Sequence, residues 1–279
     1  MNNRKRRAEI AAETIRILDQ ESYSVGGASV SIEQQLASMR AGTVTYSPTD
    51  LDTALNSMDQ SYNAKTRIEV VNQTTFYAAK SLIDKGHENP LCLNFASAKN
   101  PGGGFQGGSQ AQEECLARAS GLYQSLSLDM TYYEKNRRCK SSFYTNHLIY
   151  SPVVPVFRDD SDDLLTDPYV LSIITSPAVN AGAVRKNEPE SVSRIESEMM
   201  HRIRSLLMVA IEHKHKSIVL GAWGCGVFRN DPSQVANWFK DVLINDSRFH
   251  GAFENVVFAA HDNTSRLLNY KAFEEAFVE

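Results

Sequence analysis

Apolar positions along this chain fall into two alternating patterns. Short runs that are almost wholly apolar, at residues 91–95, 169–174 and 255–259, predict strands that are buried on both faces of a sheet. Longer segments place apolar residues three and four positions apart, which predicts amphipathic helices, the longest over residues 190–213. Strands that alternate with such helices indicate an α/β fold with a mainly parallel sheet covered on both faces.

The other expected elements follow from the same reasoning. We predict further strands at 66–72 and 217–220 and an extended segment over 149–157 that prolines interrupt. Further helices are expected at 8–22, 32–40, 74–85, 110–126, 231–243 and 265–277, with a hairpin over 23–32 and a polar, acidic loop over 159–167. The chain contains no internal repeat and no linker-like segment. We therefore expect one folded unit, in which an N-terminal helical and hairpin extension (1–65) packs on a core of residues 66–279.

Composition and charge narrow the class of protein. The 279 residues are 42% hydrophobic and 22% charged, as in ordinary folded proteins. A net charge of -4 argues against a protein that coats nucleic acid through many phosphate contacts. The four cysteines form no Cys-x-x-Cys pair, and the basic start at residues 1–7 is followed by charged residues where a signal peptide is apolar. No apolar run reaches the ~18 residues of a membrane span, so we predict a cytoplasmic protein with reduced thiols.

The most unusual segment is a loop with five glycines in seven positions, residues 102–108, between a predicted strand and a predicted helix. Ligands of open α/β sheets bind at the carboxyl ends of strands, and glycines there let backbone N–H groups approach a phosphate or a sugar. The spacing matches neither the dinucleotide-binding fingerprint nor the P-loop. The alternative is a merely flexible surface loop.

A second glycine-rich loop, residues 221–230, follows another predicted strand and precedes a helix that Asp231 and Pro232 are expected to start. Two such loops at one sheet edge are suited to hold the two phosphates of a diphosphate between them. Phe228 has two open interpretations. Its ring either stacks on a base or ribose, or packs on the core.

Taken together, these segments resemble a known family. Pro-Gly-Gly-Gly at 101–104 followed by Gln112-Glu113-Glu114 resembles the signature of the poly(ADP-ribose) glycohydrolases, and residues 94–97, 175–180 and 221–228 resemble its microbial-type branch. The resemblance implies a three-layer α/β/α macrodomain-like fold with a mixed, mainly parallel sheet. It also implies hydrolysis of the ribose–ribose O-glycosidic bond of poly(ADP-ribose) from the chain end, with release of ADP-ribose.

The resemblance also implies roles for the paired carboxyls. Glu114 would protonate the leaving ribose oxygen and then activate water, whereas Glu113 would hold hydroxyls of the distal ribose. Neighbouring helical residues point about 100° apart, so the pair cannot flank one bond as in most glycosidases. One carboxyl must therefore work in both steps. Such an acid needs a raised pKa, which burial and a nearby diphosphate favour and which the helix N-terminus opposes.

The rest of the site is carried over in the same way. For the distal ribose, both Ser97 and Asn100 fit the spacing, and we favour Asn100. The substrate-binding set is then completed by Gln112, by main-chain groups of Gly103, Gly104, Gly224, Cys225, Gly226 and Val227, and by Phe228.

Other residues have competing interpretations. Cys225 as a nucleophile lacks a histidine nearby in the sequence to act as its base. His213 and His215 have the His-x-His spacing of some metal ligands, but histidines also complement the dipole at the end of a helix. The acid–base route requires neither a metal nor a cofactor. His261 and Asp262 line the cleft or cap a loop. The basic segment 137–140 is either a solvated patch or a contact for polymer phosphates.

Two rival functions remain open at this point. One is removal of single ADP-ribose groups from protein or nucleic acid, and the other is a macrodomain that binds ADP-ribose without cleaving it. In each case the expected partners are ADP-ribose or ADP-ribosylated proteins. Neither a membrane nor an obligate nucleic-acid partner is expected, and we expect a monomer.

Overall fold

The computed structural model describes residues 3–62 and 65–277. The outer bounds predicted at residues 1 and 279, and the first two residues of the basic start, lie outside this part of the chain. Within it, seven strands form one sheet in the order β3-β6-β7-β5-β8-β9-β4. They are β3 (Val44–Tyr46), β4 (Arg67–Val71), β5 (Leu91–Phe95), β6 (Leu148–Arg158), β7 (Leu164–Ser176), β8 (Ser217–Leu220) and β9 (Asn255–Ala259).

The predicted mixed, mainly parallel sheet is confirmed. Strands β7, β5, β8, β9 and β4 run parallel to one another, whereas β6 is antiparallel to β7 and the edge strand β3 is antiparallel to β6. The parallel strands are apolar on both faces, which is why they read as continuous apolar runs in the sequence. Their carboxyl ends therefore meet at one edge of the sheet.

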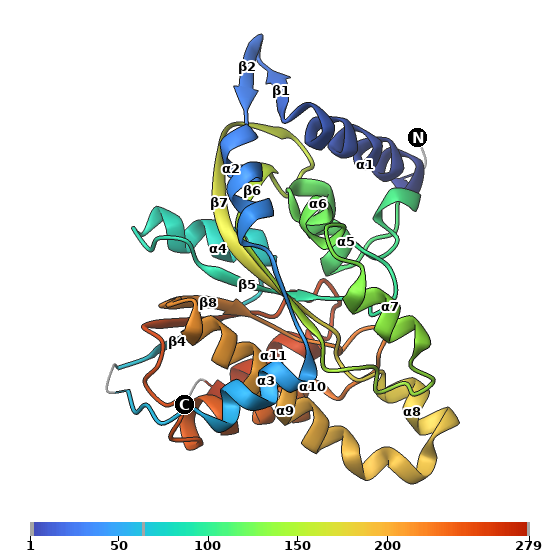
Figure 1. Cartoon of the computed structure of the whole chain (residues 1–279), viewed down its shortest axis with the longest axis vertical. Helices are drawn as coiled ribbons and strands as arrows, with labels where there is room; N and C mark the ends of the chain where they lie inside the picture. The colour runs from blue at the N-terminus through green and yellow to red at the C-terminus, as the bar shows by residue number, and fades with distance from the viewer. Residues whose placement is uncertain (1–2, 63–64, 278–279) are drawn as a thin grey trace.

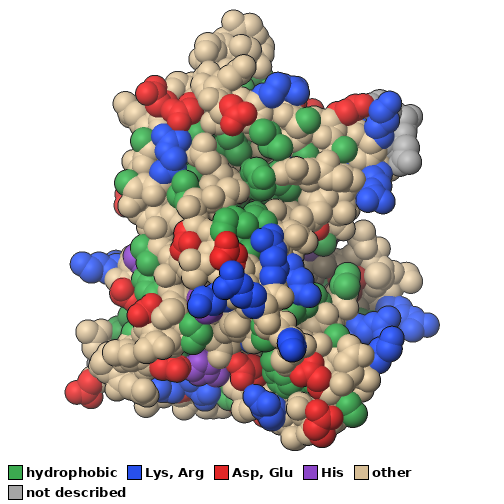
Figure 2. Space-filling view, turned by 45° about the vertical axis from the view of Figure 1, so that its right-hand side comes forward, with side chains coloured by type: hydrophobic (Ala, Val, Ile, Leu, Met, Phe, Trp, Pro, Cys, Tyr) green, Lys and Arg blue, Asp and Glu red, His purple; other side chains and the backbone are tan. Residues whose placement is uncertain are grey.

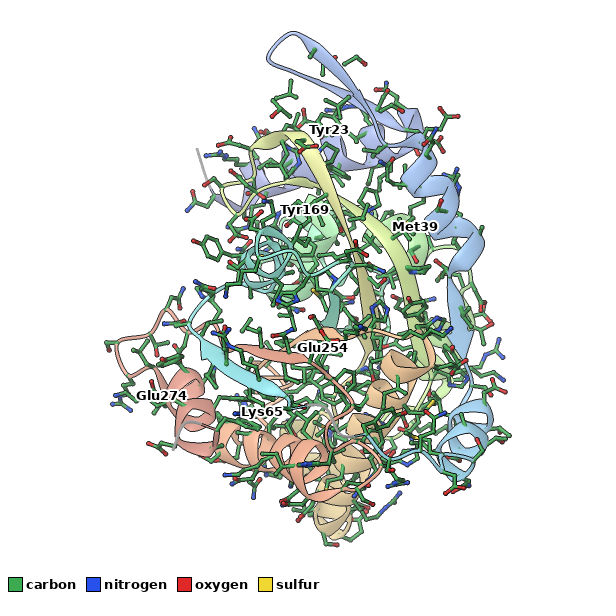
Figure 3. All side chains as sticks on the ribbon, turned by 90° about the vertical axis from the view of Figure 1, so that its left-hand side faces the viewer. Tyr23, Met39, Lys65, Tyr169, Glu254 and Glu274 are labelled. Atoms are coloured by element: carbon green, nitrogen blue, oxygen red, sulfur yellow. The ribbon has the colours of Figure 1, made fainter. Side chains whose placement is uncertain are left out.

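Helices cover both faces, as expected for three layers (Figure 1). One face packs against α3 (Pro48–Asn56), α8 (Ala181–Asn187), α9 (Ile195–Glu212), α10 (Pro232–Lys240) and α11 (Leu268–Phe277). The other packs against α2 (Glu33–Gly42), α4 (Thr75–Asp84), α5 (Gln112–Ala119), α6 (Leu122–Leu126) and α7 (Thr131–Arg138). Tyr23, Met39 and Tyr169 all belong to this second side (Figure 3).

The first part of the N-terminal extension, up to the end of α2, packs on the second side. Helix α1 (Asn3–Gln20) begins earlier than predicted, and the predicted hairpin is confirmed as β1 (Ser22–Val25) and β2 (Ala28–Ser31). Gly26 and Gly27 supply the positive φ angles, 59° and 83°, that its two-residue turn requires. Because β3 and α3 contribute to the main sheet and its covering layer, the extension is continuous with the core, and the division at residue 65 stays a prediction.

Two expectations about the middle of the chain were wrong. The predicted helix over 110–126 is two helices, α5 and α6, because Ser120 leaves the helical path to pair with Val156 and the Gly121 N–H donates to Pro155 O. The acidic segment 159–167 is also not all loop. Strand β7 begins at Leu164, so the loop between β6 and β7 is only residues 159–163.

Several element ends also differ from the prediction. The prolines do not interrupt β6, which absorbs a bulge near Val153 (φ 49°) and runs on to Arg158. The long helix over 190–213 starts as a 3-10 helix, η2 (Pro189–Arg194), and α10 ends in a π-helical turn, η3 (Asp241–Asn245). The short elements β3, α3 and α7 were not predicted.

Two further expectations concern the compartment. All four cysteines are free thiols. Among the described residues, no helix is long and apolar enough to cross a membrane.

Candidate active site

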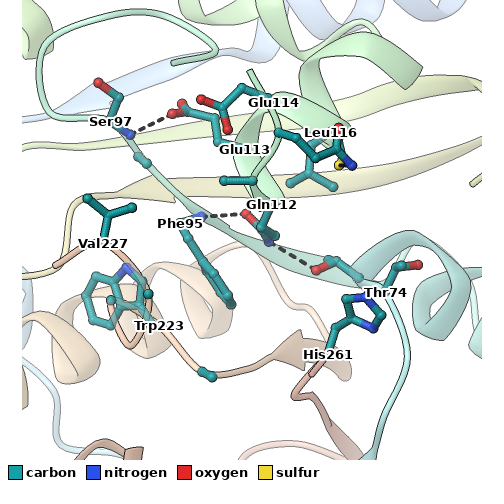
Figure 4. A pocket seen from close by; sticks show the side chains of 18 of the residues that line it. Thr74, Phe95, Ser97, Gln112, Glu113, Glu114, Leu116, Trp223, Val227 and His261 are labelled. Atoms are coloured by element: carbon teal, nitrogen blue, oxygen red, sulfur yellow. Dashed lines mark hydrogen bonds between the residues drawn. The ribbon is translucent and has the colours of Figure 1, made fainter. Parts of the chain in front are cut away.

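Helix α5 is held against the carboxyl end of β5 by its first residue, Gln112 (Figure 4). The side-chain oxygen Oε1 accepts the N–H of Phe95 at 2.8 Å, and Nε2 donates to Leu93 O at 2.7 Å. The same Nε2 donates to Thr75 Oγ1 at 3.0 Å on α4. Both ends of the Gln112 amide are thus used inside the protein, where they fix the start of the helix on the strand.

The next residue, Glu113, points into the protein and is only 3% exposed. Its Oε2 accepts the Ser97 N–H at 2.6 Å, and its Oε1 accepts from Asn94 Nδ2 at 3.2 Å. Burial raises the pKa of Glu113 to about 8, because desolvation of the carboxylate outweighs these hydrogen bonds, and the neighbouring Glu114 charge acts in the same direction as burial. Glu113 therefore carries a proton through most of the neutral range.

Glu114 is half-buried and lies against the first glycine loop. Its Oε1 accepts the Gly104 N–H at 3.0 Å, and the N–H of Gly103 donates to Asn100 O at 3.0 Å. The sequence analysis predicted that the backbone N–H groups of Gly103 and Gly104 bind the substrate. Both are engaged within the protein, where the loop holds the Glu114 carboxyl.

The segment between β5 and the glycine loop contains both candidates for the distal ribose. Ser97 already has several bonds, because its Oγ accepts the N–H groups of Lys99 (3.2 Å) and Asn100 (3.1 Å) while its own N–H holds Glu113. The Asn100 side chain is exposed and makes no hydrogen bond to other described residues. Asn100 therefore has the open polar group of the two.

The second glycine loop is fixed from beneath by buried side chains. Trp223 Nε1 donates to Ser176 O at 3.2 Å, and Asn230 Nδ2 donates to Gly224 O at 3.1 Å. Gly224 has a φ of 75°, and a Cβ there would lie 2.5 Å from the Cβ of Ala178, so the position requires glycine.

The open amides of this loop lie near its tip. The Cys225 N–H donates to Ala222 O at 3.2 Å and is not open. The N–H groups of Gly226 and Val227 donate to no other described residue, and Val227 is 87% exposed. Phe228 packs against the core and also lines the cavity, with its ring 5.9 Å from that of Tyr144.

A cavity of about 760 Å³, a volume suited to a nucleotide-sized ligand, is lined by the segment after β5, by α5 and by the second glycine loop. Glu113, Glu114, Asn100, Gln112, Gly224, Gly226, Val227 and Phe228 all line it. Gly103, Gly104 and Cys225 of the predicted site are not among its lining residues. Sequence reasoning did not single out further lining residues, namely Thr74, Arg118, Tyr144, Trp223, Asn263 and Asn269. Asp159, Asp160 and Asp162 of the acidic loop also line the cavity. His261 lines the cavity, whereas the Asp262 carboxylate accepts the N–H groups of Thr264 and Asn269 and so shapes its loop.

The competing chemistries find little support in the geometry. Burial raises the pKa of the Cys225 thiol, which keeps it neutral and poorly nucleophilic. His213 Nε2 lies 2.9 Å from Tyr46 Oη, and His215 Nε2 lies 2.9 Å from Tyr150 Oη. Within residues 3–62 and 65–277, no group of His, Cys, Asp and Glu is arranged to hold a metal ion.

The fold has three layers, α/β/α, and two glycine loops lie at the carboxyl edge of its sheet. Helix α5 begins at the same edge and carries the paired carboxyls in its first turn. These features define a macrodomain-like hydrolase. Residues 11–159 match the family model of the microbial-type PARG catalytic domain, where PARG denotes poly(ADP-ribose) glycohydrolase. The chain belongs to this family and is a hydrolase of the glycosidic bonds of poly(ADP-ribose).

Solved structures give the same assignment. The chain is 43% identical to the poly(ADP-ribose) glycohydrolase of Thermomonospora curvata bound to the inhibitor ADP-HPD, with 98% of this chain and 100% of that one covered and a TM-score of 0.91. It is 44% identical to the enzyme of Deinococcus radiodurans in complex with ADP-ribose, with 92% and 99% covered and a TM-score of 0.83. A comparison with curated proteins gave no match.

Proposed function

We propose that this hydrolase removes ADP-ribose units from the end of poly(ADP-ribose), with Glu114 as the acid and base. The observation that carries the proposal is the division between the two carboxyls. Both carboxyls line the cavity, but Glu113 is buried and accepts N–H groups on both oxygens, whereas Glu114 is half-buried and held by one backbone N–H. Only Glu114 is placed to exchange a proton with a bound substrate.

The chemistry follows from a single working carboxyl. The Glu114 carboxyl gives its proton to the oxygen of the leaving ribose as the glycosidic bond to the distal ribose breaks. Water then attacks the anomeric carbon, and the Glu114 carboxylate takes the proton that this water loses. The cycle consumes one water and returns Glu114 to its acid form.

The other residues bind and orient the substrate. Glu113 and the open side chain of Asn100 hold hydroxyls of the distal ribose. The open N–H groups of Gly226 and Val227 bind phosphate oxygens, as backbone amides of glycine loops do elsewhere. Phe228 and Tyr144 cover a sugar face. A ligand of this chemistry is bound in the Deinococcus radiodurans enzyme, whose structure contains ADP-ribose.

Gln112 and the first glycine loop serve this arrangement indirectly. Gln112 positions α5, and Gly103 and Gly104 position the Glu114 carboxyl. We therefore propose that these three residues position the site, and that the residues of the preceding paragraph contact the substrate.

The test is release of ADP-ribose from purified poly(ADP-ribose) by the wild type and by Glu114→Gln, with the exposed Glu190→Gln as a matched control. Release by the wild type and the control, with loss in Glu114→Gln and retained ADP-ribose binding in calorimetry, supports the proposal. Early products that are single ADP-ribose units support cleavage from the chain end, whereas early oligomers contradict it. Near-normal turnover by Glu114→Gln would remove the acid–base assignment.

The cellular setting is also part of the proposal. We propose a cytoplasmic monomer whose partners are ADP-ribosylated proteins, without a membrane or an obligate nucleic-acid partner. The four free thiols are consistent with a reducing compartment. Light scattering of the purified chain at two concentrations tests the monomer, because a mass that doubles with concentration contradicts it.

A further inference from the structure

Basic side chains come together from two segments, and one of them, Lys99, lines the cavity. Lys99 precedes the first glycine loop, and Arg137, Arg138 and Lys140 lie on α7 and just after it. We refer to these four residues as the Lys99 patch. All four are exposed. On the face drawn in Figure 2, Lys and Arg side chains gather in the middle, to one side of a hollow.

The two segments are joined by a direct contact. Arg137 Nε donates to Lys99 O at 2.7 Å, so α7 is held against the loop that leads to Asn100 and the glycines. The other two guanidinium nitrogens of Arg137 have no hydrogen-bond or ion-pair partner among the described residues. The contact therefore fixes the guanidinium beside the loop and leaves its outer edge available.

The protein leaves most of this positive charge uncompensated. Arg138 lies 3.6 Å from Glu134, but Lys99 and Lys140 form no ion pair with any described residue. This occurs in a chain whose net charge is -4. Exposed basic groups without acidic partners, gathered at one place on an acidic protein, are suited to an anionic ligand.

The same cavity is also lined by acidic side chains. Asp159, Asp160 and Asp162, on the loop between β6 and β7, line the same cavity as Lys99. The loop is fixed, since Thr74 Oγ1 donates to Asp160 Oδ2 at 2.7 Å. A chain of phosphates leaving the cavity is therefore repelled by the carboxylates of this loop and attracted by the Lys99 patch.

The patch also lies at the correct end of the cavity. Lys99 is two residues after Ser97, whose N–H holds the Glu113 carboxyl at 2.6 Å, so it is close to the catalytic pair. In poly(ADP-ribose), the leaving oxygen belongs to a ribose whose 5′ carbon carries the diphosphate of the next unit. This diphosphate is therefore only one sugar ring away from the bond that breaks.

We propose that the Lys99 patch binds the diphosphate of the second ADP-ribose unit, the unit that stays on the polymer after cleavage. The proposal rests on the proposed function, because it places the scissile bond at Glu114. It gives the enzyme a physical means to prefer polymer over a single ADP-ribose group, which has no second unit for the patch to bind. The contribution is electrostatic and falls as salt rises.

The experiment compares two substrates that share the terminal ADP-ribose. One is poly(ADP-ribose), and the other is ADP-ribose joined through the same anomeric carbon to 4-methylumbelliferone, which has no second diphosphate. The double variant Lys99→Gln/Lys140→Gln keeps Arg137 and its bond to the Lys99 backbone. For polymer at low salt we expect KM to rise about fivefold with kcat unchanged, as for the loss of two exposed charge contacts. For the umbelliferyl substrate we expect no change.

Matched variants separate charge from structure. Lys99→Arg/Lys140→Arg keeps the charge and should keep the wild-type KM for polymer. Lys214→Gln removes an exposed charge just before β8, at the opposite edge of the sheet from the site. It should leave KM and kcat unchanged for both substrates. The proposal is overturned if the Gln double variant shows the wild-type KM for polymer, or if its KM rises equally for polymer and for the umbelliferyl substrate. Failure of the wild type to turn over either substrate would instead contradict the proposed function.

Discussion

The backbone of Gly103 lies so close to the Glu114 carboxyl that a Cβ there would sit 2.5 Å from Oε1, well inside contact distance. Its φ of 60° is also a conformation that residues with side chains rarely adopt. The loop thus passes directly over the carboxyl assigned to proton transfer. Glycine at this position is required by the placement of Glu114, in addition to any approach of substrate.

We predict that Gly103→Ala lowers kcat by about a hundredfold, because the methyl group displaces the Glu114 carboxyl by a fraction of its own size. The measurement is turnover of poly(ADP-ribose) together with ADP-ribose binding, which should weaken much less. Gly107→Ala is the matched control in the same loop, since the nearest atom to its Cβ is 3.9 Å away. Equal activity in the two variants would contradict the prediction.

The raised pKa of Glu113 predicts how stability depends on pH. An unfolded glutamate loses its proton near pH 4.5, whereas folded Glu113 keeps its proton up to about pH 8. Between these values the folded state binds more protons than the unfolded state, so its stability falls as pH rises. Glu113→Gln cannot lose a proton and should not share this loss.

The measurement is the free energy of unfolding of the wild type and Glu113→Gln in urea at several pH values from 5 to 8. The wild type should lose stability relative to the variant by up to about 1.4 kcal/mol per pH unit in this window. Parallel curves for the two proteins would show that Glu113 titrates normally in the folded state.

Gln112 provides a test of anchoring that does not depend on substrate. Replacement by Glu keeps the shape but puts a carboxylate oxygen where Nε2 donates to Leu93 O and Thr75 Oγ1. We predict a loss of about 1–3 kcal/mol in the free energy of unfolding, because buried acceptors then face one another without a donor. The control is Gln106→Glu in η1 (Phe105–Gly107), an exposed residue whose Nε2 donates only to Tyr123 Oη at 2.8 Å. Because the Tyr123 hydroxyl can itself donate to a carboxylate, this variant should be near neutral in urea unfolding. A Gln112→Glu protein as stable as the wild type would contradict the anchoring role.

The sequence pointed to the candidate catalytic elements because they are contiguous in the chain. The glycine loop and Gln112-Glu113-Glu114 follow one strand within twenty residues, and their chemistry and spacing are visible without a fold. The hydrogen-bond partners of individual backbone groups could not be predicted from the sequence. Whether the Gly104 N–H binds substrate or Glu114 depends on where the loop crosses α5, which no local pattern encodes.

Residues contributed by distant segments were missed for a related reason. Tyr144 and Thr74 line the cavity through long-range contacts, since Tyr144 lies against Phe228 of the second glycine loop and Thr74 bonds to Asp160. Likewise the break between α5 and α6 arises from the bridge between Ser120 and Val156, which overrides the helical preference of the segment. The N-terminal helix was predicted, but its contact with the catalytic loop was not.

That contact supplies a last prediction. Arg4 Nε and Arg7 Nε of α1 donate to the carbonyl oxygens of Gly107 and Gly108 at 2.9 Å, and Thr14 Oγ1 donates to Arg118 O at 2.5 Å on α5. A Cβ at Gly108 would overlap the Arg4 carbonyl oxygen, at a φ of 73°. Helix α1 therefore clamps the glycine loop from outside the cavity.

We predict that Gly108→Ala pushes α1 away from the loop, lowers the melting temperature by several degrees, corresponding to about 1–2 kcal/mol, and lowers kcat more than it weakens ADP-ribose binding. Hydrogen exchange should become faster in residues 3–14 and 102–109 together, because the two segments lose the same contact. Gly107→Ala is again the control, since its Cβ has room. Faster exchange in α1 with unchanged kcat would show that the clamp supports the fold and does not position Glu114.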